Sequence, residues 1–109
     1  MTYDGYENYE TRTCAIWLDT VRLDNEIIEI KLADLSAKYP EDPDKVCYLL
    51  AGWIKDKLLD KYRMIERMFG ETDNYGDPAD GFGHIVIDLL QNSIEKINFK
   101  EVADQFMDN

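Results

Sequence analysis

His84, the only histidine in this sequence, is the side chain best suited to proton transfer near neutral pH. Asp80 and Asp88 are close to it in the sequence, so His84 could act as a general base or as a metal ligand. A lone histidine without a partner motif is more typical of a helix start or a surface position. The sequence contains no CxxC, P-loop or GxGxxG motif and no recognisable Ser-His-Asp arrangement. We therefore expect no catalytic residue and a protein that is not an enzyme.

The segment 70–83 is the second place where chemistry is conceivable. It holds four glycines, one proline and four acidic residues without a base. An EF-hand needs oxygen ligands at loop positions 1, 3, 5 and 12. Counting from Asp73, position 3 is Tyr75, so the calcium-binding pattern fails. We expect a long acidic, glycine-rich loop with no metal and no cofactor, although an irregular site for a divalent cation stays open.

The charge balance is strongly acidic and unevenly distributed. The chain has 12 Lys and Arg against 23 Asp and Glu, for a formal net charge of −11. Residues 40–70 carry 6 acids and 6 bases, whereas residues 71–109 carry 9 acids and 2 bases. Phosphate binding needs a concentrated basic surface. The composition therefore argues against direct binding to nucleic acid or to an anionic membrane.

The length of 109 residues and the apolar composition predict one domain, 1–109, with a small core. No apolar run approaches the roughly 18 residues of a membrane helix, and the polar start does not resemble a signal peptide. We expect a cytoplasmic protein. Its two cysteines, Cys14 and Cys47, are expected to be reduced core residues.

Apolar spacing and cap signals predict an all-α fold. Asn8 caps a helix over about 9–20, and a second helix follows a cap at Asp24 or Asn25 and ends before Pro40. Asp42 and Pro43 begin a long helix that runs to Phe69 and ends at Gly70. A fourth helix starts near 80–83. Asn98, with Glu101 in a capping-box arrangement, starts a last short one.

These elements should form a small bundle of four or five helices around the long central one, with residues 1–8 as a flexible N-terminus. In the first helix the predicted core face is Cys14, Trp17, Leu18 and Val21. Gly52 lies inside the long helix and indicates either a close helix crossing or a break.

Two short motifs resemble those of a family of small uncharacterised proteins of phages, plasmids and prokaryotic genomes. The first consists of Asn8, Tyr9, Glu10 and Thr11, followed after a short apolar run by Trp17, Leu18 and Asp19. The second, near the C-terminus, contains Asn98, Phe99 and Glu101, with Phe99 where the family usually has Trp.

The chain departs from the family at Arg12, where Trp is frequent, and at Thr20 and Val21, where the family often has Asn-Asp. The resemblance implies a mobile-element context and no particular mechanism. Its motif residues are either helix-start residues and core anchors, with Trp17 near Phe99, or part of a functional site.

The favoured hypothesis is binding rather than catalysis. The chain would be an accessory protein of a phage or mobile element that binds, and inhibits, a host defence protein, such as a CRISPR effector, or a nucleic-acid-processing protein. Carboxylates would replace DNA phosphates in the basic groove of that partner. The contact residues of this DNA-mimicking surface would be Glu71, Asp73, Tyr75, Asp77, Asp80, Asp104 and Asp108.

Two alternatives remain. One is a structural or regulatory homo-oligomer, for example a homodimer, assembled through surplus apolar surface on the long helix. The other is a metal-binding domain or metal-dependent enzyme that uses the acidic loop.

Overall fold

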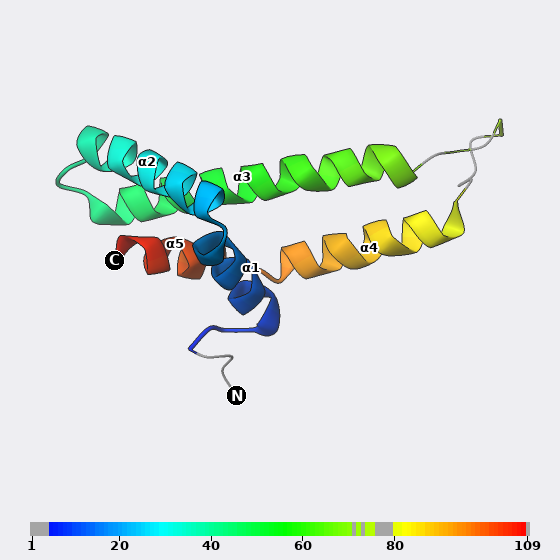
Figure 1. Cartoon of the computed structure of the whole chain (residues 1–109), viewed down its shortest axis with the longest axis horizontal. Coiled ribbons are helices and arrows are strands. Elements are labelled where there is room, and N and C mark those ends of the chain that lie inside the picture. The colour runs from blue at the N-terminus through cyan, green and yellow to red at the C-terminus, as the bar shows by residue number, and fades with distance from the viewer. Residues whose placement is uncertain (1–4, 71, 73, 76–79, 109) are drawn as a thin grey trace.

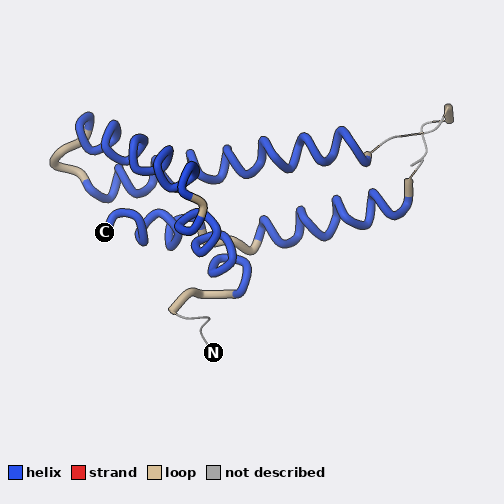
Figure 2. The backbone as a smooth tube through the Cα atoms, in the orientation of Figure 1, coloured by secondary structure: helices blue, strands red, loops and turns tan. Residues whose placement is uncertain are grey.

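The computed structural model of the chain describes residues 5–70, 72, 74–75 and 80–108, and within these ranges it contains five α-helices and no strand (Figures 1 and 2). The helices are α1 (Tyr9–Thr20), α2 (Arg22–Lys38), α3 (Pro43–Phe69), α4 (Gly81–Glu95) and α5 (Phe99–Met107). The predicted all-α bundle around one long helix is thus confirmed.

Side-chain caps begin four of the five helices. The carboxylate or amide oxygens of Asn8, Asp42, Asp80 and Asn98 each accept a hydrogen bond from a backbone N–H three residues on. The caps predicted at Asn8, Asp42 and Asn98 are confirmed. The cap predicted at Asp24 or Asn25 is wrong, because α2 already begins at Arg22, after a single extended residue, Val21, and without a side-chain cap.

The long helix α3 is continuous through Gly52. An added Cβ at Gly52 would meet nothing within 4 Å, so neither a close helix crossing nor a break exists there. Both interpretations of this glycine are therefore wrong, and its cost is the ordinary loss of helix propensity.

The core lies where the first half of α3 meets α2 and α5, and α1 completes it by packing on α2 and α5. Its fully buried side chains include Leu50 of α3 and Phe106 of α5, and both cysteines are free, with Cys47 buried and Cys14 half-buried. On α1 the buried residues are Thr11 and Ala15. The predicted α1 face is only partly right, because Trp17 and Val21 are exposed.

The second half of α3 and the whole of α4 form a helical hairpin that projects from this bundle (Figure 1). The molecule measures 55 × 34 × 24 Å with a radius of gyration of 16.6 Å, against roughly 13 Å for a compact domain of this length. Only Gly83 and Ile87 of α4 are buried. Although α4 is rich in apolar residues, no helix within the described ranges has the length and hydropathy to cross a membrane.

Candidate functional site

The acidic residues predicted to form one surface are not brought together. Asp80 starts α4 at the hairpin tip, whereas Asp104 and Asp108 belong to the end of α5, near the opposite end of α3 (Figure 1). Tyr75, at the tip, is 89% exposed. Glu71, Asp73 and Asp77 lie outside the described residues. Asp80 and the α5 acids therefore do not lie on one face of the molecule.

Two of these carboxylates already have structural roles. Asp80 accepts a hydrogen bond from the Gly83 backbone N–H at 3.0 Å. Asp104 accepts one from the Cys47 thiol at 2.9 Å and lies 3.4 Å from the Lys100 ammonium. Burial, together with the Asp104 hydrogen bond, raises the pKa of Cys47 to about 11, so the thiol stays protonated and inert.

Four residues of the family-like motifs form one hydrogen-bonded node between α1 and α5. Asn8 Oδ1 accepts from the Thr11 backbone N–H and hydroxyl at 2.8 and 2.7 Å. The buried Thr11 hydroxyl in turn accepts from the Asn98 backbone N–H at 2.8 Å. Asn8 Nδ2 donates to the Lys96 carbonyl at 2.7 Å. The node satisfies the orphan N–H groups of two helices at once.

Glu101 takes part in this node in an unexpected way. A capping box would turn its carboxylate back onto the Asn98 N–H, but Thr11 already occupies that donor. Glu101 instead accepts from the backbone N–H of Glu7 at 2.8 Å, while Glu7 Oε2 accepts from Asn98 Nδ2 at 3.0 Å. Asn8, Thr11, Asn98 and Glu101 are therefore structural, and residues 7 and 8 of the predicted flexible N-terminus are tied down.

Four other residues of the first motif line an apolar groove between α1 and the α3–α4 hairpin. The groove has a volume of about 480 Å³. Tyr9, Glu10, Trp17 and Leu18 of α1 line one wall. The opposite wall consists of Leu58, Lys61, Tyr62 and Ile65 of α3 and of Leu90, Ser93, Ile94 and Ile97 at and beyond α4. We call this cavity the α1 groove.

Trp17 is the most conspicuous side chain of the α1 groove, because 63% of it is exposed although it is a large apolar residue. Trp17 and Phe99 were expected to lie together in the core, but Trp17 is exposed and does not share a core position with Phe99. Phe99 packs against the core and lines a separate cavity between α3 and α4. Asp19, the last motif residue, accepts a weak hydrogen bond from Asn25 at 3.4 Å.

A second cavity continues the α1 groove past α1. It also has a volume of about 480 Å³, and it shares Cys14, Leu18, Leu58 and Lys61 with the first. Its remaining walls include Leu23 and Ile27 of α2, both exposed. One apolar channel thus runs along two sides of the C-terminal half of α1, with few charged groups on its lining.

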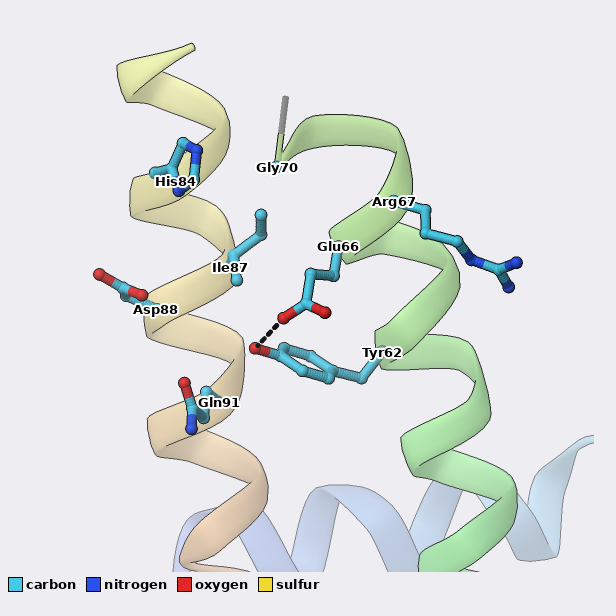
Figure 3. A pocket seen from close by; sticks show the side chains of 8 residues that line it. All are labelled: Tyr62, Glu66, Arg67, Gly70, His84, Ile87, Asp88 and Gln91. Atoms are coloured by element: carbon cyan, nitrogen blue, oxygen red, sulfur yellow. Dashed lines mark hydrogen bonds between the residues drawn. The ribbon is translucent and has the colours of Figure 1, made fainter. Parts of the chain in front are cut away.

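His84 lies in a more polar cleft on another side of the hairpin (Figure 3). Tyr62 and Glu66 project from α3 into this cleft and form a hydrogen bond of 3.4 Å, whereas Arg67 and Asp88 point away. Burial raises the pKa of Tyr62, and the Glu66 carboxylate raises it further. His84 Nε2 is buried and has no hydrogen-bond partner among the residues that the structure describes. In the described part of the chain, no three His, Cys, Asp or Glu side chains are grouped so that they could hold a metal ion.

Sequence reasoning found one wall of the α1 groove but not the groove itself. The resemblance singled out Tyr9, Glu10, Trp17 and Leu18, whereas no sequence pattern placed Leu58, Ile65 and Leu90 opposite them. The signal that could have found the site is the length of α3, whose apolar face continues past the point where α1, α2 and α5 cover it.

Comparison of the chain with protein-family models, with curated proteins and with solved structures finds no match. The α1 groove therefore has to be interpreted from its own residues and geometry.

Proposed function

We propose that this chain is a non-enzymatic accessory protein that acts by binding another protein in the α1 groove. The observation that carries the proposal is an exposed Trp17 at the mouth of an apolar channel. Tryptophan is among the residues that contribute most to binding energy at protein interfaces, and it does so next to well-packed apolar pockets. A phage or mobile-element context, as in the family that the motifs resemble, fits such an accessory role.

The chemistry of the lining favours an apolar helix or strand as the bound segment. Leu58, Ile65, Leu90 and Ile94 offer no polar group to orient a small polar substrate. The two charged groups at the mouth, Glu10 and Lys61, can pair with polar groups that flank an apolar segment. Amphipathic helices bind grooves of this kind through side chains spaced at i, i+3, i+4 and i+7.

The experiment compares two variants that each remove an exposed aromatic side chain. Trp17→Ser deletes the side chain at the mouth of the groove, and Tyr48→Ser deletes a 76% exposed tyrosine from the bundle part of α3. Tagged proteins are used to capture partners from a nuclease-treated bacterial lysate. We expect Trp17→Ser to lose at least about tenfold of the captured protein, as for a hot-spot residue, and Tyr48→Ser to lose none.

Circular dichroism serves as the folding control, since neither side chain is buried. Equal capture by the wild type and by Trp17→Ser, together with an equal solution mass of the two folded proteins, would contradict a role of the α1 groove in binding.

The acidic end of the hairpin supports a second candidate, engagement of a basic nucleic-acid-binding protein. Its observation is Tyr75, which is 89% exposed and lies in the sequence among Glu71, Asp73 and Asp77, between α3 and α4. Since Asp104 and Asp108 lie near the other end of the long axis, the two sets of acids can be tested separately.

Charge reversal of Glu71, Asp73 and Asp77 together should abolish salt-sensitive capture of a basic host protein. Charge reversal of Asp104 and Asp108 should leave it unchanged. Capture that is insensitive to both reversals, or to salt between low and high ionic strength, would rule this candidate out.

A further inference from the structure

The outer face of α4 is apolar and uncovered. Phe82, Ile85, Val86 and Leu89 are all exposed, Phe82 to 86%, and they follow the i, i+3, i+4, i+7 spacing of a single helix face. Ile87, the buried residue of α4, faces α3 instead. This outer face has the pattern of a helix that docks into a groove of another protein.

The same face is complementary to itself when a second α4 lies antiparallel beside it. With Val86 opposite Leu89 of the second copy, Ile85 lies opposite Leu90, and Phe82 lies opposite Ser93. Each of these pairs occurs twice, as a two-fold axis requires. The seam positions Phe82, Ile85, Val86, Leu89 and Ser93 carry no charge, and Asp88 lies beside them at the rim of the His84 cleft.

The ends of the seam are polar. In this register Glu95 of one copy lies opposite Asp80 of the other, and Lys96 follows one residue, or about 1.5 Å, further along the helix axis. The Asp80 carboxylate is turned toward Gly83 and α3, where it caps α4, and so does not enter the apolar part of the seam.

This register carries Phe82 of the second copy to the α1 groove. Ser93, the residue opposite Phe82, lines the groove with Trp17, and its small side chain leaves space for an aromatic ring. The helix α1, which crosses the base of the hairpin, then limits how far the tip of the second hairpin can advance (Figure 1). The groove of each copy would receive the tip of the other.

The exposed apolar area is a large part of what a dimer of ordinary size needs. Trp17, Phe82, Ile85, Val86 and Leu89 are between 46% and 86% exposed. A large apolar side chain offers roughly 100 Å² when fully exposed, so these five offer on the order of 300 Å² per copy. A standard interface buries about 800 Å² per partner, of which roughly 450 Å² is apolar.

We propose that the partner of the α1 groove is a second copy of this chain, bound as a two-fold dimer in which α4 pairs antiparallel with α4 and Phe82 enters the partner's groove. This inference rests on the proposed function, because it names the protein that the groove binds. Since each copy carries a net charge of −11, the dimer should tighten as salt screens their repulsion.

The first test is the solution mass by light scattering at micromolar concentration. The wild type should show twice the chain mass of 12.8 kDa. Ile85→Glu should weaken the dimer at least about 100-fold, because it places an unpaired carboxylate in the apolar seam. The matched control is Ile30→Glu, which alters a 70% exposed isoleucine on α2 and should leave the mass doubled.

The second test fixes the register. Chains carrying Phe82→Cys and chains carrying Ser93→Cys, with different tags, are mixed and treated with a short bifunctional maleimide. We expect linkage between the two kinds of chain. Little linkage is expected between two Phe82→Cys chains, whose residues 82 lie about 16 Å apart along the axis in this arrangement.

Three results would overturn the dimer: a single-chain mass at all concentrations, a doubled mass that Ile85→Glu leaves intact, or linkage of 82 to 82 in preference to 82 to 93. None of them touches the proposed function by itself. If the chain is monomeric and Trp17→Ser still abolishes capture of another protein, the groove binds a different partner. If Trp17→Ser changes neither capture nor mass, the proposed function fails as well.

Discussion

The bundle and the hairpin of this molecule use the same kinds of apolar residues with opposite results. In the bundle, α2 and α5 pack on the first half of α3 and α1 packs on α2 and α5, so that Leu50, Val102 and Phe106 are completely buried. In the hairpin, α3 has only α4 beside it, and Met68, Phe82 and Leu89 remain largely exposed. The difference is one of layers, because a helix that is apolar on several sides needs a neighbour on each.

This contrast separates residues that make the fold from residues that are available for binding. The motif residues divide in the same way: Thr11 and Asn98 belong to the bundle, and Trp17 belongs to the groove at the base of the hairpin. Single exposed apolar side chains are common on protein surfaces, but a continuous set along one helix face indicates an interaction site.

The largest effect on stability should come from removing a phenylalanine side chain from the bundle, and the matching change in the hairpin should have almost none. Phe106→Ala empties a fully buried site and should lower the free energy of unfolding by about 3–5 kcal/mol. Phe82→Ala, at a low protein concentration, should change it by less than about 0.5 kcal/mol. Urea denaturation followed by circular dichroism measures both. Similar losses for the two variants would mean that the hairpin is packed as tightly as the bundle.

The node between α1 and α5 should give the next largest effect. Thr11→Val keeps the shape of the side chain but leaves the Asn98 N–H without its buried acceptor and removes one of the two hydrogen bonds to Asn8 Oδ1. We expect a loss of about 1–3 kcal/mol, the usual cost of an unsatisfied buried group. Thr20→Val, at the exposed end of α1, is the control and should be nearly neutral. A neutral Thr11→Val would show that the node contributes little to stability.

The close approach of the two hairpin helices can be tested through a pair of glycines. An added Cβ at Gly83 would lie 2.7 Å from the Phe69 carbonyl oxygen and 2.6 Å from an Asp80 carboxylate oxygen, whereas at Gly81 it would meet nothing within 4 Å. Gly83→Ala should therefore destabilise the hairpin by about 1–3 kcal/mol, and Gly81→Ala should not.

Hydrogen exchange gives the local readout for this pair. Amides of α4 should exchange faster in Gly83→Ala, while amides of α5 stay protected, because regions of a protein can open separately. Equal acceleration in both helices would indicate that the bundle and the hairpin unfold as one unit.

The parts of this fold that depend on a few neighbouring residues could be predicted from the sequence. Asn8, Asp42 and Asn98 are caps because each side chain reaches a backbone N–H three residues on. The bond from Glu7 to Glu101 spans 94 residues, and no local pattern indicates it. It exists because α1 and α5 begin side by side, and Thr11 then displaces Glu101 from its expected partner.

The candidate site could be predicted only in part, for the same reason. Apolar spacing places Trp17 and Leu90 on helix faces that must pack against something. It does not say whether this chain or another protein supplies the packing partner. On α1 the small residues Thr11 and Ala15 fill the tight contact, which turns Trp17 outward. Charge selected other residues, such as Asp80 and Asp104. Asp80 caps α4 at one end of the molecule, and Asp104 accepts a hydrogen bond from Cys47 in the bundle.

The last predicted effect is a dependence of stability on alkaline pH. Burial raises the pKa of Cys14, at the edge of the α1 groove, to about 11, and burial with Asp104 raises that of Cys47 in the bundle to about 11. In the unfolded chain both thiols ionise at about pH 8.5. The unfolded state therefore loses protons first, so stability is complete below that pH and falls as pH rises to about 11.

Thermal unfolding between pH 8 and pH 11 measures this fall, and substitution of each cysteine by alanine assigns it to a region. The tyrosines titrate over the same range, so the informative quantity is the difference between the pH profile of each variant and that of the wild type. Both substitutions should flatten the profile, because each removes a thiol that is neutral only in the folded state. If only Cys47→Ala flattens it, water reaches Cys14 through the open groove, and the boundary between packed bundle and open hairpin lies at α1.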